Sequence, residues 1–89
     1  MLSSREVTIL NRQGMHARPA MQLVETSSRF DSDISIRKGD QQVNAKSIME
    51  VMTLEAVMGT VLVLEAEGND AEEALDALAQ LVSEKFSED

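Results

Sequence analysis

The chain has a single proline, Pro19, and its position constrains how the first third of the sequence folds. A proline ring fixes φ near the helical value and removes an N–H, so proline suits the first turn of a helix. Gly14, shortly upstream, allows a turn out of the strand-like run that precedes it. The spacing therefore predicts a strand, a turn and a helix that starts about two residues after His16, the only histidine.

The segment Gly14–Ala20 also gathers groups that attract an anion. His16 and Arg18 lie beside the predicted helix start, where backbone N–H groups have no partner within the helix. Those free donors and the helix dipole both favour negative charge. Because imidazole can be a neutral nucleophile near physiological pH, the segment predicts reversible handling of phosphate. The alternative from these residues alone is that His16 caps the helix and Arg18 is a solvated charge.

The rest of the sequence alternates between the periods of strands and helices. Polar and apolar residues alternate in runs rich in β-branched side chains, which predict strands at 6–10, 33–37, 41–44 and 60–66. Apolar residues at helical spacing predict helices at 17–28 and 71–82, and a capping-box pattern predicts a short helix at 47–53. The run 60–66 is apolar on both faces at its start, so it is expected in the middle of the sheet. The order predicts an α+β fold, β-α-β-β-α-β-α, with an antiparallel sheet and helices on one face.

Two of the predicted helices begin with residues that match the capping-box pattern. Ser47 precedes the second helix and is followed by Glu50, and Asn69 stands in the same relation to Glu72 before the third. The acidic residues in the first turn of the last helix suit its dipole. Residues 83–89, beyond that helix, are expected to fray.

Composition limits the classes of protein to which the chain can belong. The chain has 89 residues, of which 43% are hydrophobic, so residues 1–89 are expected to form a single domain. The sequence has no membrane-length apolar run, no signal-peptide pattern and no cysteine, which predicts a cytoplasmic protein without membrane insertion. A lone histidine without cysteine also argues against a metal site, and no cofactor is expected.

The charge distribution separates the predicted phosphate site from the rest of the chain. A formal net charge of −8 argues against a nucleic-acid partner, which needs clustered Lys and Arg. Acidic residues crowd the last third, where Lys85 is the only basic residue after Glu65. Around His16 the balance reverses, because Arg12 and Arg18 are close in sequence and no carboxylate occurs between positions 6 and 25.

Three motifs in order along the chain resemble the HPr family, the histidine-containing phosphocarrier proteins of the phosphoenolpyruvate-dependent phosphotransferase system. They are Gly14–Ala20, Lys46–Met49 and Ala66–Gly68. The resemblance implies an open-faced β-sandwich, in which a four-stranded antiparallel sheet carries three helices on one face. It also implies a phosphoryl carrier rather than a stand-alone enzyme. Such a carrier takes phosphate from enzyme I and passes it to an A-component in sugar uptake or regulation.

The resemblance assigns roles to the residues around His16. It implies that His16 carries the phosphoryl group on Nδ1, with phosphoenolpyruvate as the ultimate donor. Arg18 would bind the phosphoryl oxygens by charge-assisted hydrogen bonds, together with the backbone N–H groups of Ala17 and Arg18. Pro19 would shape the turn.

Ser47 has a structural and a functional interpretation. As a helix N-cap it contributes about 1 kcal/mol, which suffices to explain it. In many HPr proteins the matching serine is phosphorylated by HPr kinase/phosphorylase, which makes Ser47 a candidate regulatory site. Glu50 would repel such a phosphate. Glu50 and Glu55 stand where kinase-regulated members often have glycine, and this departure is nearer the nitrogen-branch paralogue NPr.

The resemblance also predicts an apolar surface for partner docking, formed by Met15, Ile48, Met49 and Met52. Adaptable methionines suit a carrier that binds successive unrelated proteins, whereas Met58 is expected in the core. Val61 and Val63 are expected on the uncovered side of the sheet, and the protein is expected to be a monomer. The alternative function is a regulatory binding module of a nitrogen-type or incomplete phosphotransferase system, acting by phosphorylation-dependent docking.

Overall fold

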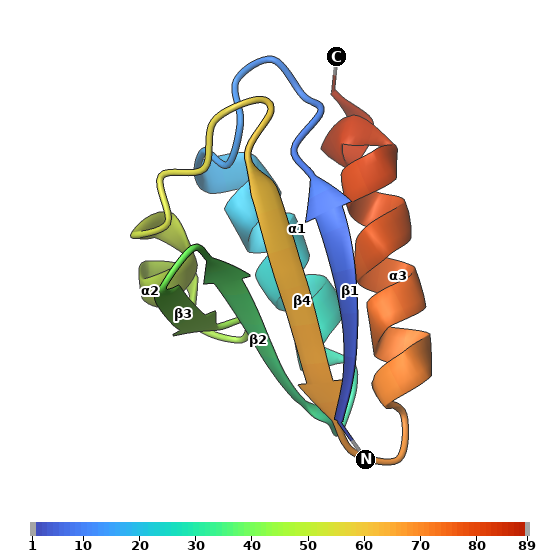
Figure 1. The fold of residues 1–89 in the computed structure, drawn as a ribbon. Helices are drawn as coiled ribbons and strands as arrows, with labels where there is room; N and C mark the ends of the chain where they lie inside the picture. The colour runs from blue at the N-terminus through green and yellow to red at the C-terminus, as the bar shows by residue number, and fades with distance from the viewer. Residues whose placement is uncertain (1, 89) are drawn as a thin grey trace.

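The computed structural model describes residues 2–88, and the order of its elements is the predicted one. They are β1 (Leu2–Thr8), α1 (Ala17–Ser28), β2 (Asp33–Lys38), β3 (Gln41–Asn44), α2 (Ile48–Met52), β4 (Val61–Glu67), α3 (Ala71–Ser83) and a short 3₁₀ helix, η1 (Lys85–Ser87). The pattern β-α-β-β-α-β-α is therefore confirmed, with η1 added after the last helix. Figure 1 shows the helices packed on one side of the sheet.

The four strands form one antiparallel sheet in the order β1-β4-β2-β3. β1 pairs with β4 from Leu2↔Glu67 to Thr8↔Val61. β2 pairs with the other edge of β4 and begins at Asp33↔Glu67. The predicted central position of β4 is therefore confirmed.

Burial alternates along β4 and separates the two faces of the sheet. Leu62, Leu64 and Ala66 are fully buried, whereas Val61 is 48% exposed. Only one face of β4 meets the helices (Figure 1). Val61 and the half-buried Val63 lie on the uncovered face, as expected.

An aliphatic core fills the space between the sheet and the helices. Fully buried side chains come from each layer, including Ile36 and Leu64 from the sheet, Leu23 from α1 and Leu75 from α3. Such side chains each contribute about 1.5–3 kcal/mol by leaving water. The core therefore aligns α1 and α3 on the sheet and positions the loops at their ends.

β1 differs from its prediction at both ends. It starts at Leu2 and ends at Thr8, whereas the alternating pattern predicted residues 6–10. The polar residues Ser3 and Ser4 are in a strand because β4 offers them a pairing edge. Tertiary pairing thus overrides the weak strand propensity of these residues. Beyond the strand, the Ile9 N–H still donates to the Thr60 carbonyl at 2.9 Å.

The capping box at α2 is only half formed. The Ser47 hydroxyl accepts from the Glu50 N–H at 3.3 Å, as predicted. Glu50 does not return the contact, and its Oε1 accepts from the Asn44 N–H at 2.9 Å instead. The reason is that the Ser47 N–H already donates to the Asn44 carbonyl at 3.1 Å.

The predicted cap of α3 by Asn69 and Glu72 is wrong. Asp70 is the N-cap residue, and its side chain makes no capping hydrogen bond. Its carboxylate accepts from the backbone N–H groups of Asp31 and Ser32, each at 2.9 Å, and from the Ser32 hydroxyl. The Ser32 hydroxyl, followed by the Asp31 N–H, lowers the pKa of the Asp70 carboxyl. Asp70 therefore joins the α1–β2 loop to the start of α3.

The end of the chain is ordered by burial, so the expected fraying is wrong for residues 83–88, while Asp89 lies outside the described residues. Phe86 is 1% exposed and belongs to the core. Three consecutive residues, Lys85, Phe86 and Ser87, have positive φ angles of 59°, 54° and 62°. The turn that they form brings the tail beside the β1–α1 loop (Figure 1).

Glu55 also has a backbone conformation that side chains disfavour. Its φ is 48°, in the loop between α2 and β4. The flanking residues Leu54 and Ala56 are buried, whereas Glu55 is exposed. The backbone therefore adopts a left-handed conformation at Glu55, between two residues that both contribute to the core.

Glu55→Gly is expected to stabilise the protein by about 0.5–1 kcal/mol. A left-handed residue with a Cβ costs roughly 1–2 kcal/mol, and the extra unfolded-state entropy of glycine offsets about 0.5–1 kcal/mol of the gain. Denaturant unfolding measures the change. Glu55→Ala removes the carboxylate but keeps the Cβ, so it should stay close to wild type. An equal gain in both variants would assign the effect to charge and contradict the backbone explanation.

Candidate functional site

His16 lies at the N-terminus of α1. The position of Pro19 predicted the start of this helix to within one residue. His16 is the residue directly before the helix, with extended φ and ψ of −90° and −170°. Its carbonyl accepts the Ala20 N–H at 3.0 Å. Pro19 is buried in the first turn, where its missing N–H leaves no hydrogen bond unmade.

Gly14 fixes the turn that presents His16. Its φ is 70°, and a Cβ at this position would lie 2.5 Å from the Ala56 carbonyl oxygen. That same oxygen accepts the N–H of Met15 at 2.7 Å. The turn is therefore held against the loop that precedes β4, in a space that only glycine fits.

The first turn of α1 is open at its N-terminal end. The His16 side chain makes no capping hydrogen bond. Within residues 2–88, no hydrogen bond occupies the N–H of Ala17 or Arg18. The Arg18 side chain is exposed beside them. Two free donors, a helix dipole and a guanidinium are thus available to an anion beside His16.

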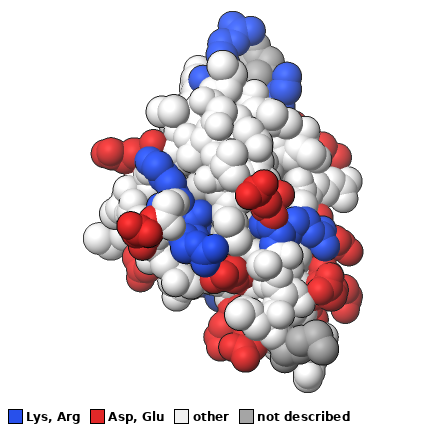
Figure 2. Space-filling view, in the orientation of Figure 1, with Lys and Arg blue, Asp and Glu red and all other residues white. Residues whose placement is uncertain are grey.

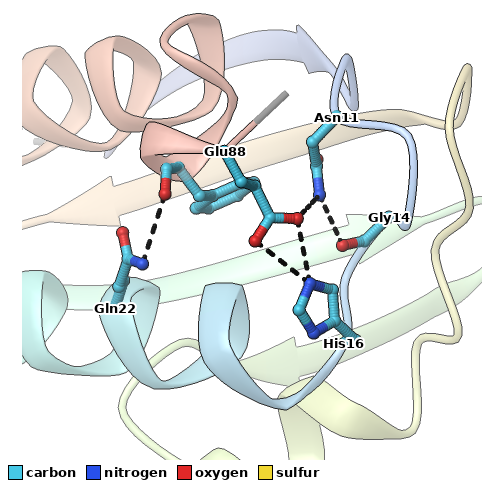
Figure 3. Close-up of polar contacts among 6 residues, drawn as sticks. Asn11, Gly14, His16, Gln22 and Glu88 are labelled. Atoms are coloured by element: carbon cyan, nitrogen blue, oxygen red, sulfur yellow. Dashed lines mark hydrogen bonds and ion pairs between the residues drawn. The ribbon is translucent and has the colours of Figure 1, made fainter.

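A carboxylate that the sequence analysis missed contacts His16. Glu88 Oε1 lies 2.9 Å from His16 Nε2, and Oε2 lies 3.2 Å from the same nitrogen (Figure 3). Asn11 Nδ2 donates to this Oε1 at 2.9 Å and to the Gly14 carbonyl at 2.7 Å. No carboxylate is close to His16 in the sequence, but one is close to it in the folded protein. It belongs to Glu88, which is 72 positions away along the chain.

The contact perturbs the tail carboxylate. The hydrogen bond from His16, followed by that from Asn11, holds the pKa of Glu88 below its ordinary value of 4.5. Burial acts in the opposite direction, and the positive charge of Arg18 adds a smaller lowering effect. The His16 and Glu88 side chains remain 35% and 21% exposed. The imidazole is thus both held in place and accessible to a partner protein.

Two residues of this site, Asn11 and Glu88, were not identified from the sequence. Asn11 lies in the turn between β1 and α1, where a polar residue is expected to be exposed, yet it is fully buried. One signal could have located Glu88, because Phe86 is one of only two phenylalanines in the chain. A large apolar residue so close to the end indicates a buried tail, and its neighbours then lie on the protein.

The predicted docking residues separate into two groups. Ile48, Met49 and Met52 of α2 are 37%, 79% and 38% exposed, and we refer to them as the α2 surface. Met15 is only 5% exposed and packs in the core, so its predicted docking role is wrong. Its position in the Gly14 turn directs it inward. Met58 shows the reverse, because it was expected in the core and is 54% exposed.

Charges of both signs alternate on the open face of the sheet. Figure 2 shows basic and acidic side chains interspersed there, and Arg37 Nη1 lies 2.8 Å from Glu65 Oε2 on this face. Such a surface does not resemble the clustered basic patches that bind nucleic acid. Among residues 2–88, no group of three or more His, Asp or Glu side chains could hold a metal ion. No helix in the same range is long and apolar enough to cross a membrane.

A half-buried but accessible histidine at an open helix start, on a small open-faced sandwich, is the arrangement expected of a phosphate-accepting carrier. The family model for the phosphotransferase-system HPr component phosphorylation site matches residues 3–84. The chain therefore belongs to the HPr family and is a phosphocarrier of the phosphotransferase system.

Curated relatives and solved structures agree with this assignment. The chain is 47% identical over 85 residues to phosphocarrier protein HPr of Treponema pallidum, covering 96% of this chain and 97% of that protein. It is 43% identical over 84 residues to phosphocarrier protein NPr of Shewanella violacea, covering 94% and 92%. The crystal structure of HPr-C-His from Thermoanaerobacter tengcongensis matches with a TM-score of 0.94 at 46% identity, covering 98% of each chain.

The Glu88 carboxyl is expected to titrate below the ordinary value of 4.5, and His16→Ala should raise its pKa towards that value. A carboxyl with a lowered folded-state pKa stabilises the fold above its unfolded pKa, and this contribution is lost as the pH falls through the folded value. Carbon-13 NMR titration of the side-chain carboxyl measures both proteins. Equal midpoints in wild type and His16→Ala would show that the imidazole does not hold the carboxylate.

Proposed function

We propose that His16 accepts a phosphoryl group from enzyme I and passes it to an A-component of the phosphotransferase system. The observation that carries the proposal is the position of His16, accessible at the open N-terminus of α1 beside Arg18. The protein acts as a phosphorylated intermediate rather than as a stand-alone enzyme, and this role requires no cofactor. These partners imply a cytoplasmic carrier.

The proposed transfer uses groups at the start of α1. A ring nitrogen of neutral His16 attacks phosphorus, and the bond from phosphorus to the donor breaks as the nitrogen–phosphorus bond forms. The N–H groups of Ala17 and Arg18 and the guanidinium of Arg18 stabilise the phosphoryl oxygens by charge-assisted hydrogen bonds. Because the resulting phosphoramidate keeps a high transfer potential, the reverse of this step delivers the group to the next protein.

The α2 surface is proposed to bind the successive partners. It is apolar and exposed, and α2 packs beside α1, at whose start His16 lies. Flexible thioethers adapt to surfaces of different shape, which suits a carrier that binds unrelated proteins in turn. Docking on this surface would bring a partner's reactive group to His16 without a change in the fold.

Incubation with phosphoenolpyruvate and enzyme I is expected to place an acid-labile phosphate on wild type and none on His16→Ala. Arg18→Ala should accept phosphate about tenfold to a hundredfold more slowly, because it removes one charged donor to the transferring group. Its melting should remain cooperative, since the Arg18 side chain is exposed. Mass spectrometry locates the phosphate, and quenched-flow labelling measures the rate.

Three outcomes would count against this proposal. They are an unlabelled wild type, equal labelling of His16→Ala, and unaltered transfer by Arg18→Ala. If His16→Ala instead controls a partner protein as wild type does, the alternative of a regulatory binding module is favoured.

Ser47 is proposed as a second, regulatory phosphorylation site. Its hydroxyl is half-buried at the start of α2, directly before the α2 surface. A phosphate there adds charge beside residues that partners must cover. The Glu50 carboxylate, held on the Asn44 N–H, lies next to this position and opposes the modification. Labelling by HPr kinase with ATP that is lost in Ser47→Ala would support the assignment.

Ser47→Asp is expected to raise the KM of enzyme I for this carrier about fivefold, with little change in kcat. Aspartate is as good an N-cap as serine, so α2 should persist. The added charge has to be desolvated when a partner covers the α2 surface, at a cost of about 1 kcal/mol for a partly exposed group. Steady-state transfer assays measure both constants.

Asn69→Asp is a matched control for Ser47→Asp, since it adds the same charge at an exposed position before α3. It should leave KM unchanged. Equal KM values for wild type and Ser47→Asp would show that partners do not cover this end of α2.

A further inference from the structure

The tail beyond α3 is fixed in place by contacts with the body of the protein. The Phe86 ring is buried, and its carbonyl accepts from Gln22 Nε2 of α1 at 3.3 Å. The Glu88 N–H then donates to the Lys85 carbonyl at 2.9 Å. Glu88 lies beyond residues 3–84, the part that the family model covers. Because the buried Phe86 ring and these hydrogen bonds fix the turn, the Glu88 carboxylate points to His16.

A second side chain holds the carboxylate against His16. Asn11 is fully buried, and its Nδ2 donates both to the Gly14 carbonyl and to Glu88 Oε1. The same Oε1 is the atom nearest to His16 Nε2, at 2.9 Å. Asn11 and Gly14 belong to the turn that precedes His16. The same turn therefore fixes the position of both the Glu88 carboxylate and the His16 imidazole.

This geometry determines which ring nitrogen carries the hydrogen. An ionised carboxylate can only accept hydrogen bonds, so the nitrogen that faces it must donate. In neutral imidazole the other nitrogen then carries the free lone pair. Figure 3 shows Nε2 facing Glu88 and the other ring nitrogen, Nδ1, on the far side of the ring. The lowered pKa of the Glu88 carboxyl agrees with an ionised acceptor.

We propose that Glu88 is a positioning residue for phosphoryl transfer, which holds the Nε2–H tautomer of His16 so that Nδ1 receives the phosphoryl group. The inference rests on the proposed function of His16. As the nitrogen–phosphorus bond forms at Nδ1 and the bond to the donor breaks, the donor atom retains the electron pair. The proton stays on Nε2, so the ring becomes positively charged.

Glu88 also stabilises the charge that develops in this step. A carboxylate within hydrogen-bond distance of Nε2 interacts more strongly with a cationic ring than with a neutral one. The effect resembles that of the buried aspartate of serine proteases, which orients a histidine and stabilises its imidazolium form. The negative charge of Glu88 lies across the ring from Nδ1 (Figure 3), and the positive charge of Arg18 is near enough to help lower the pKa of Glu88.

The test combines transfer rates with the tautomer of His16. Glu88→Ala should slow single-turnover transfer from phosphorylated enzyme I about tenfold, the lower end of the range found for partners that orient metal-bound histidines. Long-range hydrogen–nitrogen NMR spectra, taken where the imidazole is neutral, should show the hydrogen on Nε2 in wild type and a mixture in Glu88→Ala.

Two variants separate orientation from charge. Glu88→Gln keeps an oxygen between Asn11 Nδ2 and His16 Nε2, so it should preserve the tautomer and transfer at an intermediate rate. Glu84→Ala removes an equal charge from the same tail at an exposed position whose carboxylate accepts from Gln80. It should transfer like wild type and keep the tautomer.

Failure of this inference is distinguishable from failure of the proposed function. If wild type accepts no phosphate from enzyme I, the proposed function fails whatever the spectra show. If wild type accepts phosphate but Glu88→Ala is as fast or faster, Glu88 does not assist transfer. A hydrogen on Nδ1 of neutral wild-type His16, or an equal loss in Glu84→Ala, would also overturn the positioning role.

Discussion

The pairing of β4 with strands on both of its edges is the constraint on which the rest of the structure depends. β1 and β2 are distant in sequence and become neighbours of the same strand. The buried face of β4 then supplies Leu62 and Leu64 as the floor on which α1 and α3 pack. Without this central strand, neither helix would have a sheet face to bury its apolar side chains against.

The loop that leads into β4 fixes the position of the segment before His16. Its Thr60 carbonyl accepts from Ile9, its Gly59 N–H donates to the Ile9 carbonyl at 2.8 Å, and its Ala56 carbonyl accepts from Met15. These bonds hold both ends of the segment that precedes His16. The close approach of Gly14 to Ala56 then leaves little freedom in the turn. His16 is thus placed by backbone contacts, which leaves its side chain available for chemistry.

Residues from three parts of the chain meet at His16. The turn supplies Asn11, α1 supplies the free N–H groups and Arg18, and the tail supplies Glu88. Burial of Phe86 connects the tail to the core. The turn that inserts the Phe86 ring also directs the Glu88 carboxylate to the His16 imidazole. The site therefore depends on the packing of α3 and the tail as well as on the conspicuous motif around the histidine.

The sequence by itself determined the elements, their order and the histidine site, because these depend on local properties. Period, proline and glycine positions locate α1, β4 and the His16 turn without reference to the rest of the chain. Only the tertiary structure decided which residues surround them. Ser3 and Ser4 form strand because β4 pairs with them, and Met15 is buried because Gly14 turns it inward. Asp70 binds Ser32 instead of capping its own helix, and Glu88 reaches His16 from the opposite end of the chain. Such contacts join residues far apart in sequence, and no local pattern records the distance between them in the folded protein.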